Sequence, residues 1–252
     1  MRKLSILFGR ELAHYFRSPL ACTVLCFFLV LTGFNFQYGV SSLNLQPLTT
    51  TIVEAYFNTV FFWYPFVLVF PLITMRTFSE EYKLGTIEPL MTAPVRDWQV
   101  VMAKYLGALV FYLILWLPSL LYFVIFQNTT GFRAAEAVGS YFGAYSMLLL
   151  IGMFYIALGC LASALTENQI VAAIISFCLT CVMFFMSLIS FLTPQISPVL
   201  RDLSSYLSPI EHMAGFSQGI FDTRPVVYYV SLTVFTLYLT LQIFQSRRWK
   251  TA

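Results

Sequence analysis

The sequence predicts an all-α integral membrane protein with six transmembrane helices, an amphipathic interfacial helix at the N-terminus and a short cytoplasmic helix between the second and third spans. The 252 residues are 59% hydrophobic and 10% charged, whereas soluble domains carry roughly a quarter charged residues. The mean hydropathy is +0.80. Charged residues delimit long uncharged runs, each reaching the ~20 residues that a helix needs to cross the hydrocarbon core. These runs are residues 18–53, 55–75, 105–132, 137–166, 168–200 and 225–246.

The chain begins with a segment of helical period, residues 2–17. Its apolar positions share one face, and its cations lie on the other: Leu4, Leu7, Phe8, Leu12, Tyr15 and Phe16 against Arg2, Lys3, Arg10, His14 and Arg17. A helix of this kind lies in the membrane interface with its cations toward anionic headgroups. Ser18-Pro19 ends it, because proline disfavours a helical residue before it.

The spans follow as helices rather than barrel strands, because the apolar runs show no strict alternation. We expect them near residues 20–40, 53–75, 98–126, 139–164, 168–192 and 225–246, within a single domain covering residues 1–252. Pro65 and Pro71 should kink the second span. The proline- and serine-rich stretch 194–224 is expected to form short helices at the outer surface. Gly139-x-x-x-Gly143 and Gly215-x-x-x-Gly219 have a spacing that permits close helix approach.

The loop 76–97 concentrates charge in a chain that is otherwise nearly uncharged. Glu80, Glu81 and Gly85-Thr86 suit a short amphipathic helix ending near Pro89, followed by a turn at Ala93-Pro94. Its apolar face could fill a groove on a soluble partner, while its acids set the register. That face comprises Leu84, Ile87, Leu90 and Met91, and the acids are Glu80, Glu81 and Glu88. The alternative is a solvated charged turn.

Lysine and arginine predict the orientation. With the N-terminus in the cytoplasm, eleven of the fourteen Lys and Arg residues fall on the inner side, and only Arg133, Arg201 and Arg224 fall outside. This is the bias of the positive-inside rule, so both termini are expected in the cytoplasm. The positive charge then reflects topology and gives no reason to expect nucleic-acid binding.

The residues give little support for catalysis or ion conduction. The spans hold almost no ionisable groups, which usually mark ion pathways; Glu54, Lys104 and Glu167 sit at span ends, where they could snorkel. No phosphate-cradling Gly-x-x-x-x-Gly-Lys loop occurs, and His14 and His212 fall on opposite sides of the membrane. We therefore expect no catalytic, cofactor-binding or metal-binding residue in the chain. Neutral polar residues in the spans are expected to form interhelical hydrogen bonds: Asn35, Gln37, Asn58, Ser187 and Ser190.

Three sequence segments resemble the ABC-2 type permeases, the membrane subunits of one class of ATP-binding-cassette exporter. The most specific is Arg76-x-Phe-x-Glu80-Glu81-x-x-x-Gly85-Thr86-Ile-Glu88-x-Leu-x-Thr-x-Pro94-Val, followed by Trp98 and Lys104-Tyr-Leu-Gly107. The others are Ser163-Ala-Leu-Thr166-Glu167-Asn168-Gln169 and a C-terminal part running from Leu207-Ser-Pro209 to Arg247-Arg248-Trp249. The resemblance covers nearly the whole chain and looks most like the gliding-motility and nitrous-oxide-maturation subgroup.

The resemblance implies a fold, a set of partners and a location. The fold would be that of an ABC-2, or type V, exporter in a bacterial cytoplasmic membrane. Two cytoplasmic ATPase subunits would bind ATP and Mg²⁺, and a second permease copy or a homologous permease would complete the unit. A periplasmic or membrane accessory protein is a further possible partner, beside the lipid bilayer. The residues implied in ATPase coupling are Arg76, Glu80, Glu81, Gly85, Thr86, Glu88, Pro94 and Glu167. Pro89 departs from the family pattern and would shorten the coupling helix.

The function implied is a non-catalytic permease subunit that couples ATP hydrolysis by a partner to movement of cargo. The nearly charge-free spans favour a hydrophobic or amphipathic cargo. The alternative is an ATP-powered membrane scaffold that acts mechanically on an envelope or motility complex without exporting a solute. Stimulation of the ATPase by cargo would indicate the transporter, and stimulation only by a periplasmic protein would indicate the scaffold.

Overall fold

The computed structural model describes residues 2–45, 51–87, 95–130, 138–192 and 205–250. Their regular structure is entirely helical, as the composition predicts. In chain order the helices are α1 (Arg2–Arg17), α2 (Pro19–Leu45), α3 (Ile52–Phe57), α4 (Val60–Thr74), α5 (Ser79–Leu84), α7 (Asp97–Thr130), α8 (Val138–Leu165), α9 (Gln169–Leu192), α11 (Pro209–Ser217) and α12 (Thr223–Lys250).

Five helical stretches in the described chain are long and apolar enough to cross a membrane. They are Pro19–Leu43, Phe61–Leu84, Asp97–Thr129, Val138–Leu165 and Thr223–Arg247. At the position predicted for the fifth span, α9 contributes a shorter apolar stretch, Gln169–Phe185. The all-helical membrane architecture is therefore confirmed, while a count of six crossings stays a prediction.

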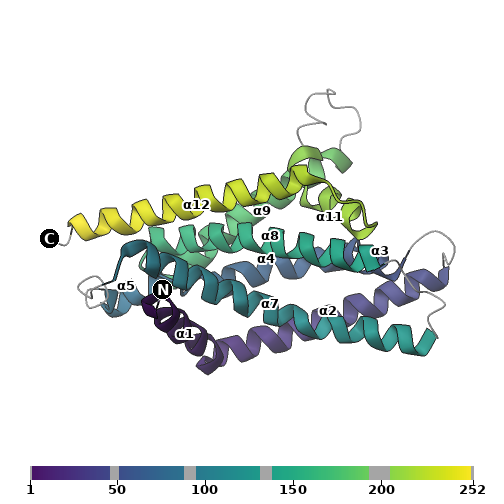
Figure 1. Ribbon diagram of the computed structural model, residues 1–252, viewed down its shortest axis with the longest axis horizontal. Helices are drawn as coiled ribbons and strands as arrows, with labels where there is room; N and C mark the ends of the chain where they lie inside the picture. Colours follow the sequence, from purple (N-terminus) through teal and green to yellow (C-terminus); the bar gives the residue numbers. More distant parts are fainter. Residues whose placement is uncertain (1, 46–50, 88–94, 131–137, 193–204, 251–252) are drawn as a thin grey trace.

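The long helices run roughly along one axis and form an elongated bundle (Figure 1). Both chain ends lie at the end of the bundle that also holds α5, whereas α3 and α11 lie toward the opposite end (Figure 1). The N-terminal helix α1, which has the bounds predicted for it, packs along α7. There the ring of Tyr15 stacks on Phe111 at 5.1 Å, and its hydroxyl donates to the carbonyl of Ile73 at 3.0 Å.

The second predicted span is interrupted near its beginning, a break that the sequence analysis did not predict. Helix α3 ends at Phe57, and α4 begins at Val60 and continues through Pro65 and Pro71. The side-chain amide of Asn35 donates to the carbonyl of Tyr56 at 3.0 Å, and Asn58 donates to the Ser217 hydroxyl at 3.3 Å. These two asparagines make interhelical bonds, as expected, and Asn35 satisfies a backbone group that the break leaves outside the helical ladder.

Helix α8 is the centre of the bundle and contacts α4, α7, α9, α11 and α12. Its glycines allow this crowding: a Cβ atom on Gly143 would lie 2.1 Å from the Phe216 carbonyl oxygen of α11. The two predicted Gly-x-x-x-Gly segments therefore approach each other within one chain. Gly219 of the second segment has a φ of 80° and turns the chain after α11.

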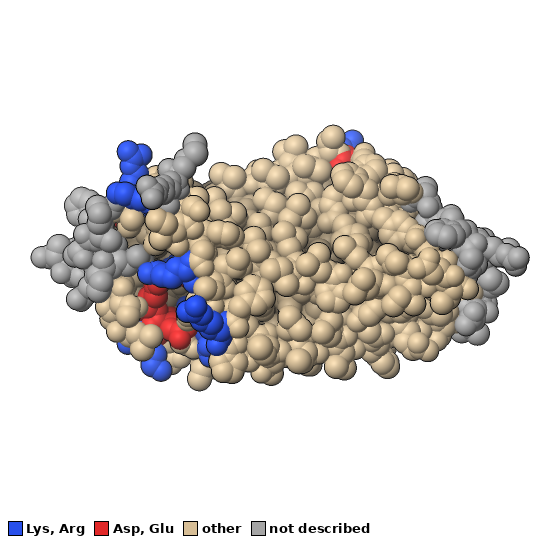
Figure 2. Space-filling model, turned by 60° about the horizontal axis from the view of Figure 1, so that its bottom comes forward, with Lys and Arg blue, Asp and Glu red and all other residues tan. Residues whose placement is uncertain are grey.

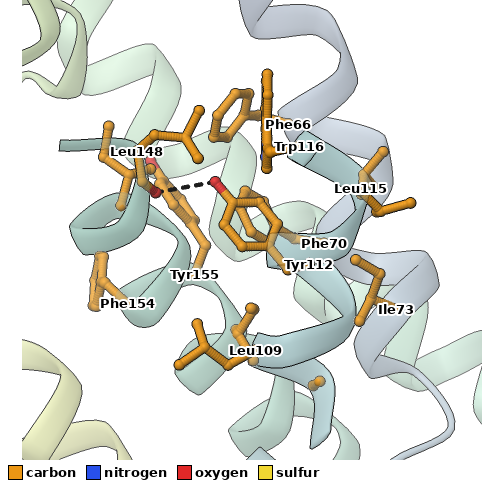
Figure 3. Close-up of a cluster of buried hydrophobic side chains, with 14 of the residues drawn as sticks. Phe66, Phe70, Ile73, Leu109, Tyr112, Leu115, Trp116, Leu148, Phe154 and Tyr155 are labelled. Carbon is orange, nitrogen blue, oxygen red and sulfur yellow. Dashed lines mark hydrogen bonds between the residues drawn. The ribbon is translucent and has the colours of Figure 1, made fainter. Parts of the chain in front are cut away.

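Aromatic side chains fill the core between α4, α7 and α8 (Figure 3). Phe70 lies 5.3 Å from Tyr112 and 5.2 Å from Tyr155, measured between ring centroids. The Tyr112 hydroxyl donates to the Leu148 carbonyl at 3.0 Å (Figure 3), so the one polar atom of this buried ring has a partner. Each such aromatic pair contributes about 0.5–1.5 kcal/mol beyond its burial, and together they fix how the helices that carry α5 are packed.

Candidate functional site

The charged loop of the sequence leaves the bundle at the end of α4 and forms α5. After Thr74 the chain makes a turn through residues 75–78, and Phe78 inserts its ring fully into the core, 6.0 Å from the ring of Phe244 on α12. Helix α5 ends at Leu84, because Gly85 adopts a left-handed conformation with φ of 68°. This conformation is a common helix terminator and is favourable mainly for glycine. The expected helix to Pro89 is thus interrupted at Gly85.

A serine from α8 caps the start of α5. The Ser163 hydroxyl accepts hydrogen bonds from the backbone N–H groups of Phe78 at 3.0 Å and Ser79 at 3.1 Å, and donates to the Met75 carbonyl at 3.2 Å. The first N–H groups of a helix have no partner within it. A residue 84 positions away in the chain supplies the acceptor that a local cap would otherwise provide.

The base of α5 is also fixed by a network of ion pairs. Lys104 of α7 has only 3% of its side chain exposed, and its Nζ lies 3.0 Å from Glu81 and 3.4 Å from Glu11 of α1. Arg10 of α1 completes the network, 2.9 Å from Glu11 and 3.4 Å from Glu81. The sequence left it possible that Lys104 snorkels to water; in the structure its ammonium instead lies between two carboxylates inside the protein.

The charges in this network alter the acidity of Glu11. Burial alone would raise the pKa of its carboxyl, but Lys104 and Arg10 outweigh burial, and the pKa lies below its usual value. Glu11 therefore stays ionised at neutral pH despite its poor access to water. Figure 2 shows the carboxylates of this end of the molecule recessed in a hollow between basic side chains.

A second connection links α5 to the turn between α8 and α9. Arg247 near the end of α12 contacts Glu167 at 3.1 Å, donates to the Leu165 carbonyl at 2.7 Å and lies over the ring of Tyr82, 4.4 Å from its centroid. Tyr82 belongs to α5 and Glu167 to the turn that the resemblance marks as a second contact. One guanidinium thus joins the two segments.

The structure places the predicted coupling residues in different settings. Arg76 donates to the Ser18 hydroxyl at 3.1 Å, Glu80 is half-buried, and Thr86 is exposed. Glu167 keeps 71% of its side chain exposed. Glu88 and Pro94 lie outside the described residues. The exposed residues at the end of α5 and directly after it are Lys83, Leu84, Gly85 and Thr86.

The residues of this site that were absent from the predicted set include Glu11, Lys104, Ser163 and Arg247. Two of them carry a signal that could have identified them. Glu11 is the single acid of a basic helix, and Lys104 is a lone charge among the apolar residues that open the third span. Ser163 and Arg247 show no comparable signal outside the resemblance.

The ion pairs and hydrogen bonds of this site connect α5 to its neighbouring helices. Within the described ranges, no group of three or more His, Cys, Asp and Glu residues could hold a metal ion. Glu81 of α5 is paired with Arg10 of α1 and Lys104 of α7, so α5 is linked to both helices. These features define a helical membrane protein with a short helix fixed at one end of its bundle.

Comparison with known proteins identifies the family. Residues 34–241 match the family described as ABC-2 family transporter protein, and the chain belongs to it. The chain is also 24% identical over 168 residues to the Probable multidrug ABC transporter permease YbhR of Escherichia coli strain K12, and to the protein of the same name from Escherichia coli O157:H7. The match covers 64% of this chain and 38% of each relative, so the chain spans well under half the length of the curated relatives.

Family membership confirms the resemblance to ABC-2 permeases that the three motifs indicate. With its apolar helices, the chain is a multi-pass membrane protein of the transporter-subunit class. The narrower likeness to gliding-motility and nitrous-oxide-maturation permeases stays a prediction.

Proposed function

We propose that this chain is the permease subunit of an ATP-binding-cassette exporter and that α5 receives the movement of a separate cytoplasmic ATPase subunit. The partner binds ATP and Mg²⁺, and this chain contributes no catalytic residue. The membrane is the bacterial cytoplasmic membrane, with both termini and α5 on the cytoplasmic side. Both chain ends lie at the same end of the bundle as α5 (Figure 1), which agrees with this orientation.

One observation carries the proposal: α5 is exposed at its tip and held at its base by four other helices. The tip presents Leu84, which is 65% exposed, beside the cation of Lys83. The base is held by Glu81 to α1 and α7, by Ser163 of α8 and by Arg247 of α12. An exposed apolar tip on a firmly held base suits a segment that docks on a partner and passes on its displacement.

The transport unit contains a second copy of this chain or a homologous permease, with the cargo path between the two copies beside spans one, two and five. The cargo is hydrophobic or amphipathic, because the described spans present apolar surfaces with few charges. The relatives' printed name, Probable multidrug ABC transporter permease, supports a transported cargo for this chain. Closure of the ATPase pair would move each half as a rigid body.

The docking role of α5 can be tested by retention of the partner. A tagged chain is purified in mild detergent from cells that also produce its ATPase subunit, and ATP hydrolysis in the eluate is measured. Leu84→Asp should reduce the retained activity about tenfold, the effect of losing roughly 1.4 kcal/mol of apolar contact. Ile220→Asp provides the control, since Ile220 is 62% exposed beyond the far-end helix α11.

Equal retention by both variants and the unsubstituted chain would reject docking at α5.

A second measurement distinguishes the exporter from the membrane scaffold. In proteoliposomes, stimulation of ATP hydrolysis by lipophilic compounds supports an exporter. Stimulation only by a periplasmic protein would instead indicate a membrane scaffold, and it would refute the export proposal.

A further inference from the structure

A cavity of about 290 Å³ lies at the α5 end of the bundle, between α1, α2, α4, α5 and α7. One side of it is polar and contains residues of the ion-pair network, and the other side is apolar. The apolar wall is formed by Leu20 and Val24 of α2, Leu72 and Ile73 of α4, and Phe111 of α7. A cavity with these two sides fits an amphiphile better than a small polar solute.

Three polar atoms of residues lining this cavity have no hydrogen-bond partner among the described residues. They are Nε of Arg76, Oε2 of Glu80 and Oε2 of Glu81, and each atom is buried. Buried polar groups in native proteins nearly always have a partner, and leaving one unsatisfied is costly, most of all when it is charged. A ligand that supplies one acceptor to Arg76 and donors to the two carboxylates would satisfy all three atoms.

The charged residues of the cavity wall indicate the charge that a ligand must carry. Its lining contains three cations, Arg10, Arg76 and Lys104, and three carboxylates, Glu11, Glu80 and Glu81. Lys104 and Arg10 already pair with Glu11 and Glu81. Within the described part of the chain, the guanidinium of Arg76 and the carboxylate of Glu80 have no ion-pair partner. A zwitterion matches this wall, whereas a simple anion or cation would leave one of the two groups unsatisfied.

The position of the cavity indicates where such a zwitterion comes from. Ser18, at the break between α1 and α2, lines it, and the first span starts at the next residue. Beyond the cavity, α2 and α4 carry exposed apolar side chains, including Phe27 and Leu68. Acyl chains of a membrane lipid could follow these two helices while its headgroup stays among the charged residues.

We propose that this cavity binds the headgroup of a phospholipid with a primary ammonium, the phosphoethanolamine type. Its phosphate accepts from Nε of Arg76, and its ammonium donates to the free oxygens of Glu80 and Glu81. Phosphocholine has the same charges, but its quaternary ammonium has no N–H group to donate. The site therefore discriminates between two zwitterionic lipids through hydrogen bonds. The lipid would contact both α1 and α5, whatever partner α5 meets.

Lipid retention measured by native mass spectrometry tests the proposal. The delipidated full chain is mixed with equal amounts of dioleoyl phosphatidylethanolamine and dioleoyl phosphatidylcholine. We expect the ethanolamine lipid to be retained about tenfold more, since a hydrogen bond to a charged group is worth at least one tenfold step in affinity. Equal retention of the two lipids by the unsubstituted chain would overturn the proposal.

Two variants locate the site, and a third serves as the control. Glu80→Gln should remove most of the preference for the ethanolamine lipid, and Arg76→Gln should lower retention of both lipids. Glu167→Gln changes an exposed acid outside the cavity lining and should leave the preference intact. If Glu80→Gln and Glu167→Gln both keep the full preference, the lipid binds elsewhere and the assignment is wrong. Because the readout needs no ATPase, its outcome is independent of the docking role of α5.

Discussion

Lys104 is the residue on which the α5 site depends most, because its ammonium is almost wholly removed from water and two carboxylates surround it. Removing one partner of a buried ion pair typically costs about 3–5 kcal/mol, since the remaining charge is left uncompensated. Lys104→Met should therefore lower the free energy of unfolding by about 3 kcal/mol. Thermal unfolding in detergent, followed by the fluorescence of the tryptophans, measures the change.

The matched control is Lys83→Met on the exposed tip of α5, where surface substitutions usually stay within about 0.5 kcal/mol. Adding Glu11→Gln and Glu81→Gln to Lys104→Met should recover part of the loss, because no uncompensated carboxylate remains. A Lys104→Met chain as stable as the Lys83→Met chain would show that the ion pairs contribute nothing.

His212 makes stability depend on pH at the far end of the bundle. Burial, partly offset by Asp222, lowers the pKa of this histidine from 6.5 to about 4, and its Nδ1 lies 3.4 Å from the hydroxyl of Tyr229. Between these two values the unfolded chain binds a proton that the folded chain does not, so stability falls as the pH drops from about 6.5 toward 4.

The pH dependence should be flatter in His212→Gln over this interval. The unfolding temperature of each chain is measured at pH 7.5 and pH 5. The change between the two pH values is then compared between the chains, so that the contributions of carboxylates present in both chains cancel. A slope identical in both chains would show that His212 is protonated equally in the folded and unfolded states.

At the scale of the element, α5 is too short to be stable alone, because isolated helices below about 12 residues are marginal in water. Ser163 supplies an acceptor to two of its first N–H groups. Ser163→Ala should cost about 1–2 kcal/mol, the range for loss of a helix cap or of a buried hydrogen bond, and should loosen α5 more than the bundle. Amide hydrogen exchange of residues 78–84 measures this local effect.

Ser146→Ala is the corresponding control on α8. The Ser146 hydroxyl donates only to the Gly143 carbonyl of its own helix, so the exchange of α5 should be unchanged. Faster exchange in both variants would indicate a general loosening of α8 and would contradict a specific capping role for Ser163.

The elements themselves could largely be predicted from the sequence, because a chain in lipid must satisfy its backbone internally and an apolar run of sufficient length has to become a helix. The bounds of α1 and α8 agree with the predicted segments 2–17 and 139–164 within one or two residues. The break at Asn58–Thr59 lies inside the segment 53–75, which the sequence analysis treats as one continuous span. There Asn35, a residue of a different helix, donates a hydrogen bond to the Tyr56 carbonyl, and a contact between helices of this kind cannot be derived from local pattern.

At the scale of the whole molecule, the candidate site was only partly predictable. The resemblance selected the segment around Glu81, but the partners of Glu81 lie on α1 and α7, 71 residues away in the case of Arg10. A pairing of this kind depends on how helices pack, and local periodicity carries no information about it. The sequence therefore selects a candidate loop, whereas the structure is needed to show what fixes the loop to the bundle.

The packing of the whole bundle depends on how closely its helices approach α8. A Cβ atom on Gly159 would lie 2.1 Å from the Thr74 hydroxyl oxygen, and one on Gly152 would lie 2.2 Å from the Tyr112 ring. Thr74 and Tyr112 are both buried, so neither can move aside without displacing α4 or α7. Gly159→Ala and Gly152→Ala should each lower the free energy of unfolding by about 1–3 kcal/mol, the usual cost of overpacking a core.

Gly139→Ala provides the comparison, because a Cβ atom there would meet nothing within 4 Å. The same substitution in an open helical position should be neutral or stabilising by about 0.5–1 kcal/mol. Thermal unfolding of the three variants measures the expected loss of stability in two of them and the expected neutral or stabilising effect in the third. Since α4 leads directly into α5, Gly159→Ala should also accelerate amide exchange in residues 78–84, whereas Gly139→Ala should not. If all three alanines shift stability equally, close packing around α8 does not determine the position of α5.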